Sequence, residues 1–167
     1  MSDVLSRPIA GSELTPRAAA AIVAAVGATA GIGGLATAPA VESRWYRRLR
    51  KPDWQPPGAV FGPVWSVLYA LLAASMLDVR RRRGGADRGL WVLYGSNLAL
   101  NLAWTLIFFR GRSPLAASAE IVALEATTVA LIVRVRPISP AASLLLVPYA
   151  LWVAFATALT WAIATRN

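Results

Sequence analysis

Long uncharged runs alternate with short charged segments along the chain. The uncharged runs cover residues 18–41, 58–77, 89–109 and 138–165, and a fifth run with two acidic residues covers 113–133. A helix of about 20 residues crosses a ~30 Å hydrocarbon core, so every run is long enough to span a membrane. The pattern predicts an all-α integral membrane protein, a multi-pass bundle of five transmembrane helices that follows an N-terminal tail of residues 1–17.

The composition agrees with this prediction. Of the 167 residues, 57% are hydrophobic, and the connections between the runs are too short to form a soluble domain. The net charge of +9 comes from basic residues in the caps between spans. Membrane lipid with anionic headgroups is therefore the expected partner, and no nucleic acid is expected.

The charges do not orient the protein in its membrane. With five spans, nine of the 17 Lys and Arg residues fall on the side of the N-terminus and eight on the other side. The positive-inside rule therefore favours neither orientation. The sequence also does not identify which membrane holds the chain.

Prolines and aromatic residues gather in the segment between the first two spans. Lys51-Pro52 and Pro56-Pro57 oppose helix formation, because proline fixes φ and moves the preceding residue out of the α region. A semi-rigid loop is expected here. Its rings, Trp45, Tyr46 and Trp54, are of the type that favours the membrane interface.

Three of the predicted helices each carry an aromatic stripe at helical spacing. The stripes are Phe61, Trp65 and Tyr69; Asn97, Asn101, Trp104 and Phe108; and Tyr149, Trp152 and Ala156. An unpaired polar group in hydrocarbon costs several kcal/mol, so the asparagines and indole N–H groups should face inward. Two arrangements fit this pattern equally: a small-molecule pocket or a packed aromatic core.

The first predicted helix is rich in Ala, Gly and Val. Gly27 and Gly31 have the spacing that lets transmembrane helices approach closely. Packing within the bundle and dimerisation are both compatible with this pair. No chemistry is expected from this helix.

Two glutamates lie within the fifth run. Glu120 and Glu125 point about 140° apart on a helix, so they do not form a paired-carboxylate site. Glu125 falls near the middle of its span, and Glu120 nearer the surface. One interpretation is a protonated Glu125 bonded to a neighbouring helix, near Thr127 or Thr128; the other is a coupling carboxylate of a transporter.

Common catalytic and metal-binding signatures are missing from the sequence. It contains no histidine and no cysteine, and it has no P-loop, nucleophile elbow or dinucleotide fingerprint. No metal site and no required cofactor are therefore expected.

Four motifs in order resemble the tryptophan-rich sensory protein and translocator protein family, also called the peripheral-type benzodiazepine receptor family. They are W-Y-x-x-L-x-K-P-x-W-x-P-P at 45–57, F-x-x-x-W-x-x-L-Y at 61–69, L-N-x-x-W-x-x-x-F-F at 100–109 and P-Y-x-x-W-x-x-F-A-T at 148–157. The resemblance covers the chain from Trp45 to the C-terminus.

The resemblance implies a five-helix membrane protein, usually a homodimer, whose pocket takes porphyrins such as protoporphyrin IX or haem as ligand. Some relatives are linked to light- and oxygen-dependent porphyrin breakdown, which would place Trp65 and Trp152 in a catalytic role. The pocket positions carried over are Tyr46, Pro57, Trp65, Tyr69, Trp104, Thr105, Phe108, Trp152 and Ala156. Asn101 joins them as a polar group on the same stripe.

Near the C-terminus the sequence departs from the family pattern. Leu159-Thr160 replaces the usual Leu-Asn, and no tyrosine lies between Leu159 and Arg166, where the proposed cholesterol motif requires one. Cholesterol transport is therefore not predicted.

A membrane-embedded porphyrin-binding protein or sensor, which moves or regulates tetrapyrroles, is the primary hypothesis. Aromatic faces supply affinity without an axial ligand, as the missing His and Cys require. The alternatives are an enzyme that degrades porphyrin photo-oxidatively and a transporter of a hydrophobic small molecule.

Overall fold

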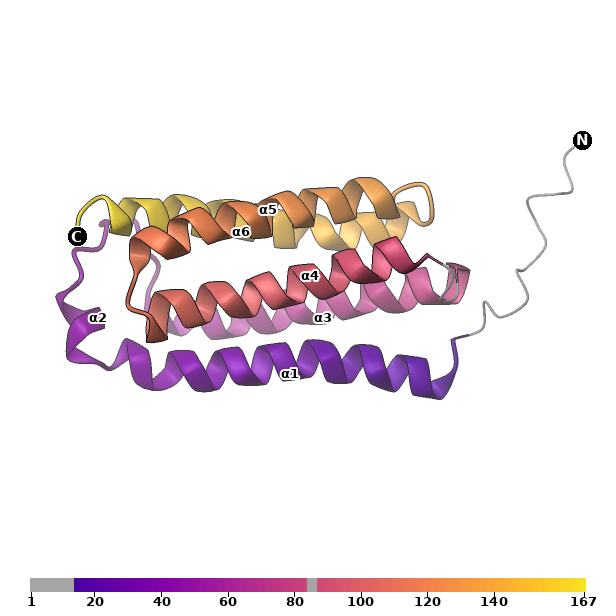
Figure 1. Ribbon diagram of the computed structural model, residues 1–167, viewed down its shortest axis with the longest axis horizontal. Coiled ribbons are helices and arrows are strands. Elements are labelled where there is room, and N and C mark those ends of the chain that lie inside the picture. Colours follow the sequence, from indigo (N-terminus) through magenta and orange to yellow (C-terminus); the bar gives the residue numbers. More distant parts are fainter. Residues whose placement is uncertain (1–13, 84–86) are drawn as a thin grey trace, which may run out of the picture.

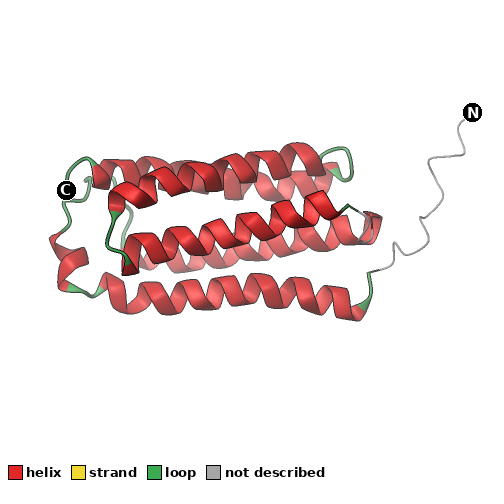
Figure 2. Ribbon diagram, viewed as in Figure 1, coloured by secondary structure: helices red, strands yellow, loops and turns green. Residues whose placement is uncertain are grey.

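The computed structural model describes residues 14–83 and 87–167, and the helices in this part run side by side along one axis (Figure 1). The long helices are α1 (Pro16–Val41), α3 (Gly58–Arg83), α4 (Arg88–Thr105), α5 (Pro114–Val135) and α6 (Pro140–Ala164). A short helix α2 (Arg44–Arg48) follows α1, and a π-helical turn η1 (Leu106–Arg110) continues α4. No strand is present among the described residues (Figure 2).

Helix starts follow directly from the sequence. Thr15, Ser113 and Ser139 are N-caps whose side chains accept a backbone N–H, and each is followed by a proline at the first helical position. These pairs suit a helix start, because proline lacks only an N–H that would have no intrahelical partner. Asp87 caps α4 in the same way, accepting from Leu90.

The five long helices form a ring. Helix α1 packs against α3 and α4, α3 packs against α6, and α5 packs against both α6 and α4. Each helix thus presents one side to the ring's interior and another to the surroundings.

The outer surface of the ring is apolar. Large hydrophobic side chains are exposed on every long helix, including Leu35, Val67, Val92, Leu115 and Leu151. In water such a surface would promote aggregation, whereas lipid accommodates it and forces backbone polar groups to pair within helices. All five helices are long and apolar enough to cross a membrane. The predicted fold class is confirmed: the protein is a multi-pass integral membrane protein.

The observed bounds differ from the expected ones mainly at α3. This helix continues past the expected end at Leu77 through the arginines to Arg83. Charged residues end the uncharged run, but arginine is a good helix former and does not end the helix. Helix α2 was not expected: Ser43 caps it, accepting from Tyr46 N–H, ahead of the prolines that end it. Of the expected N-terminal tail, residues 1–13 lie outside the described part of the chain.

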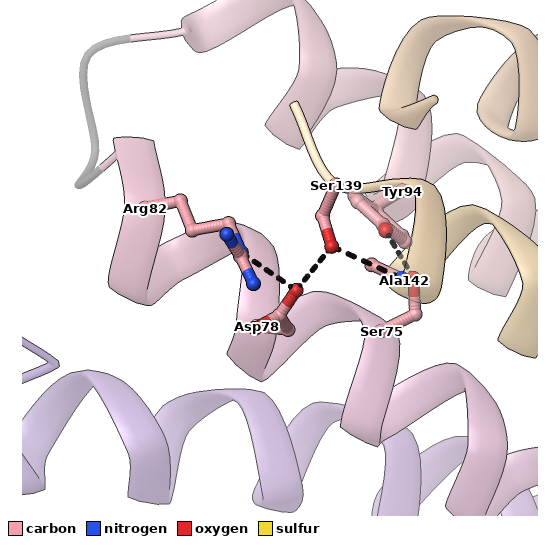
Figure 3. A network of polar contacts seen from close by, with 6 residues as sticks. All are labelled: Ser75, Asp78, Arg82, Tyr94, Ser139 and Ala142. Atoms are coloured by element: carbon pink, nitrogen blue, oxygen red, sulfur yellow. Dashed lines mark hydrogen bonds and ion pairs between the residues drawn. The ribbon is translucent and has the colours of Figure 1, made fainter. Parts of the chain in front are cut away.

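A polar network joins three helices at the end of the bundle opposite α2 (Figure 3). Asp78 Oδ2 accepts hydrogen bonds from Ser139 Oγ at 2.5 Å and from Arg82 Nε at 3.0 Å. Ser139 also caps α6 by accepting from Ala142 N–H. One turn deeper, the hydroxyls of Ser75 and Tyr94 lie 2.9 Å apart, which links α3 to α4.

We predict that Asp78→Asn weakens the fold. Hydrogen bonds to a charged group contribute about 1.5–3 kcal/mol, so the free energy of unfolding should fall by about 1–2 kcal/mol after discounting for the partial exposure of Asp78. Thermal unfolding in detergent measures the effect. Asp53→Asn, an exposed position of equal charge in the loop after α2, is the matched control and should leave the midpoint unchanged.

Candidate functional site

A cavity of about 420 Å³ lies inside the ring. Helices α1, α2, α3 and α6, the α4–η1 segment and the loop after α2 all contribute to its wall, whereas α5 contributes no lining residue. A cavity of this size falls within the range of pockets that bind small organic molecules. The two arrangements left open by the sequence therefore coexist: the aromatic stripes pack together and also line a cavity.

Aromatic rings form the α3 and α6 side of the cavity. The rings of Trp65 and Trp152 lie edge to face, with centroids 6.5 Å apart at 90°. Trp65 also lies 5.6 Å from Tyr69, and Trp152 lies 5.7 Å from Phe61. Such tilted and edge-on contacts are the favoured geometry of aromatic pairs, so these rings hold one another in place.

The wall formed by α4 and η1 is aromatic as well. Trp104 stacks on Phe108 with a centroid distance of 5.5 Å and meets Phe109 edge to face at 6.1 Å. Trp45 packs against Phe108 at 5.8 Å. Trp45 therefore belongs to the packed cluster behind the cavity. The sequence predicted only a place at the membrane interface for this residue.

Asn101 connects three helices beside the cavity. Its Oδ1 accepts from the Tyr69 hydroxyl on α3 at 2.5 Å, and its Nδ2 donates to the Tyr149 hydroxyl on α6 at 3.1 Å. Asn101 is 3% exposed and Tyr149 is fully buried. The two tyrosines therefore find their partners on one amide, which fixes α3 and α6 relative to α4.

Asn97 makes a second interhelical link, toward α5. Its Nδ2 donates to the hydroxyls of Thr127 at 3.0 Å and Thr128 at 2.9 Å, and both hydroxyls donate to Leu124 O. The threonines expected near Glu125 thus bond to Asn97 and to their own helix. The structure gives Glu125 Oε2 no bond to a neighbouring helix among the described residues.

The glutamates of α5 have few partners. Both carboxyl oxygens of Glu120, and Oε2 of Glu125, are buried without a hydrogen-bond partner among the described residues. Along α5, Glu120 lies nearer the start of the helix and Glu125 near its middle, as expected. Neither residue lines the cavity, so the geometry gives a transport role for Glu125 no support.

The loop after α2 lies across one end of the cavity. Gln55 of this loop and Tyr46 of α2 line the cavity, with Gln55 Nε2 3.5 Å from the Tyr46 hydroxyl. Lys51 Nζ donates to Tyr46 O and lies 4.1 Å from the centre of the Tyr46 ring. Burial raises the pKa of Tyr46 above its usual value, an effect that the Gln55 hydrogen bond opposes, and partial burial lowers the pKa of Lys51.

The C-terminus anchors this loop. Asn167 accepts from Arg50 N–H at 2.9 Å and donates to Arg50 O at 3.1 Å, and its Nδ2 also donates to Ile163 O on α6. The loop is thus held by side-chain bonds to α6 as well as by its prolines.

The structure brings nine of the ten candidate binding residues into one cavity wall. These are Tyr46, Trp65, Tyr69, Asn101, Trp104, Thr105, Phe108, Trp152 and Ala156. Pro57 is the exception: its carbonyl accepts from Val60 N–H in the first turn of α3, and it does not line the cavity. The expectation that the stripes face inward is confirmed.

Sequence reasoning missed the contribution of α1. Ala30, Gly33, Gly34 and Thr37 line the cavity, although no site residue was expected on this helix. In the sequence, only their small size distinguished these residues, because membrane-spanning helices commonly carry large apolar side chains. Gly27 and Gly31 are exposed on the outside, so packing within the bundle is wrong for this pair and dimerisation stays a prediction.

The fold and cavity together define a class: a five-span membrane protein with an aromatic pocket between its helices. Residues 19–166 match the model of the TspO/MBR family. The chain therefore belongs to the TspO/MBR family.

Similar proteins with names support this family assignment. The chain is 37% identical over 140 residues to the tryptophan-rich protein TspO of Chlorobaculum tepidum, covering 82% of this chain and 88% of the relative. It is 34% identical to the protein of the same name from Bacillus cereus, over 76% of this chain and 83% of the relative. It is 38% identical to the human translocator protein, over 74% and 75% respectively.

We predict that Asn101→Leu destabilises the protein, because it leaves the hydroxyls of Tyr69 and Tyr149 without partners. A buried unsatisfied group costs about 1–3 kcal/mol, so the free energy of unfolding should fall by about 2–4 kcal/mol. Equilibrium unfolding in mixed detergent measures the change.

A rescue variant separates this effect from packing. Adding Tyr149→Phe to Asn101→Leu removes one stranded hydroxyl and should recover about 1 kcal/mol or more. A double variant no more stable than Asn101→Leu would show that the tyrosine bonds are not what the amide contributes.

Proposed function

We propose that the cavity binds a porphyrin, with protoporphyrin IX as the test ligand, and that the protein acts as a membrane-embedded porphyrin-binding protein or sensor. The observation that carries the proposal is the arrangement of Trp65, Trp104 and Trp152 around one cavity of suitable size. A flat conjugated ring gains contact area on such surfaces.

Polar atoms of the cavity residues support a ligand with acceptor groups. Among the described residues, the indole nitrogens of Trp104 and Trp152 are buried without a hydrogen-bond partner. An unpaired N–H in an apolar interior is unfavourable, and an acceptor on a bound molecule would relieve it. The carboxylates of a porphyrin are such acceptors, and haem and metal-free porphyrin share them.

The donor set favours binding through ring faces over binding through iron. The chain has no histidine or cysteine, the usual protein ligands of haem iron, and Tyr69 and Tyr149 are both occupied by Asn101. Haem and metal-free porphyrin should therefore bind with similar affinity, through contacts that both share.

We predict that Gly34→Leu blocks the cavity. A Cβ at Gly34 meets no atom within 4 Å, so the added side chain can enter the cavity without disturbing the helix. Overfilling a binding cavity should weaken protoporphyrin IX binding about tenfold or more, measured by quenching of tryptophan fluorescence in the dark.

Gly31→Leu is the matched control. This residue lies on the same helix and also has no atom within 4 Å of an added Cβ, but it does not line the cavity. It should bind porphyrin within twofold of the wild type. Equal affinity for Gly34→Leu and wild type would place the porphyrin elsewhere and refute the proposal.

A second function, light- and oxygen-dependent porphyrin breakdown, is favoured by the contact between Trp65 and Trp152 in the cavity wall. In this mechanism the excited porphyrin and oxygen generate a radical at one of these indoles, and an opened tetrapyrrole is the product. Both indoles would lie against the bound ring, where electron transfer is fast.

Replacement of either indole by phenylalanine separates binding from breakdown. Trp65→Phe and Trp152→Phe keep an aromatic face, so affinity should change by less than about threefold, whereas the rate of light-dependent loss of porphyrin absorbance should fall at least about tenfold. Trp161→Phe, an exposed tryptophan outside the cavity, is the control. Undiminished breakdown in both cavity variants would show that neither indole has the catalytic role.

A further inference from the structure

A second cavity of about 340 Å³ lies outside the ring, between the end of α1 and η1. Its apolar wall is formed by the α1 segment from Leu35 to Ala40 and by Phe109, and its polar part by Ser43, Arg110 and Arg112. Phe109 also lines the inner cavity, so one ring separates the two. The outer cavity shares no other residue with the porphyrin site.

The backbone around the two arginines has an unusual construction. Arg110 ends the π-helical turn, and Gly111 N–H donates back to Leu106 O at 2.9 Å. A Cβ at Gly111 would lie 2.7 Å from Ile107 O, so only glycine fits there. Arg112 then has a φ of 51°, which a non-glycine residue rarely adopts. π-Turns and strained residues of this kind concentrate at functional sites.

No ion pair among the described residues neutralises the arginines of this cavity. In the part of the chain that the structure describes, the ion pairs join Arg82 with Asp78 and Arg134 with Asp87. Neither Arg110 nor Arg112 takes part in one, although both are exposed beside the apolar wall. Two guanidinium groups that line one cavity favour a bound anion there.

The position of the cavity selects an amphiphilic anion. Leu35 is 80% exposed on the outer face of α1, where lipid chains lie, whereas the arginines lie at the end of the spans, at the depth of headgroups. An acidic phospholipid matches both parts: its phosphate and headgroup meet the arginines and an acyl chain lies along Leu35. A free anion would leave the apolar wall uncovered.

We propose that the outer cavity between α1 and η1 is a specific binding site for one acidic phospholipid, held by Arg110 and Arg112. The forked N–H donors of a guanidinium group suit the oxygens of a phosphate group. Each arginine near an anionic headgroup also adds electrostatic attraction. The site is independent of the porphyrin cavity.

Native mass spectrometry tests the proposal on the purified full chain. The detergent-solubilised protein is mixed with phosphatidylglycerol and phosphatidylcholine of identical acyl chains, and the detergent is removed in the mass spectrometer. The wild type should retain phosphatidylglycerol preferentially, at one molecule per chain. Arg110→Gln/Arg112→Gln should lower this preference about tenfold or more, since each arginine near a headgroup contributes about fivefold.

Arg47→Gln/Arg48→Gln is the matched control. These exposed arginines of α2 lie at the same end of the bundle and outside the cavity, and both double variants reduce the net charge from +9 to +7. The control should keep the preference within twofold. An equal loss in both double variants, or equal retention of the two lipids by the wild type, would overturn the proposal in favour of general headgroup attraction.

Two further experiments test whether the variants fold and whether the bound phosphate group belongs to a lipid or to a free anion. Arg112→Gly removes one guanidinium and relaxes the positive φ, so it should unfold at or above the wild-type temperature and still lose about fivefold in lipid preference. Inorganic phosphate at millimolar concentration should not displace phosphatidylglycerol. Displacement would identify a free-anion site and overturn the lipid assignment, as would an unchanged preference in Arg112→Gly.

Discussion

The amide of Asn101 is the point on which the inner architecture depends. Inside a membrane protein there is no bulk water to satisfy a buried hydroxyl, so Tyr69 and Tyr149 must find partners within the bundle. One asparagine serves both, accepting from α3 and donating to α6. Because the two bonds use different atoms of one planar group, they fix the positions of α3 and α6 relative to α4 beside the cavity.

The cavity exists because large and small residues are divided between helices. Helices α3, α4 and α6 contribute rings, which support one another through edge-on contacts, while α1 contributes alanine and glycine. If α1 carried side chains of ordinary size at Gly33 and Gly34, they would fill the space that the rings enclose. Helix α5 lies behind α4 and α6 and stabilises the wall through Asn97 and its two threonine partners.

The two ends of the bundle differ in construction. At one end, Asp78, Ser139, Ser75 and Tyr94 bind α3, α4 and α6 together close to the caps (Figure 3). At the other end, a loop held by Asn167 lies over the inner cavity, and a π-turn sets two arginines beside an outer one. Polar bonds close the first end, whereas the second carries the residues that can meet ligands.

Much of the fold and of the site was determined by the sequence alone. Uncharged run length gave the five spans, since the thickness of the hydrocarbon core sets a minimum length. Helical spacing predicted the inward-facing stripes and with them Asn101, because an indole or an amide in lipid would be unpaired. The family motifs predicted eight more residues that the structure places in the same wall.

Only the tertiary structure determined where the cavity lies and which polar groups bond to one another beside it. Spacing along one helix carries no information on which helices are neighbours, so the place of α1 in the cavity wall and the exclusion of Pro57 were not predictable. For the same reason Thr127 and Thr128, four or fewer residues from Glu125, bond to Asn97 on another helix. The cavity is a property of the ring of helices, because its volume is the space left between side chains that meet only after folding.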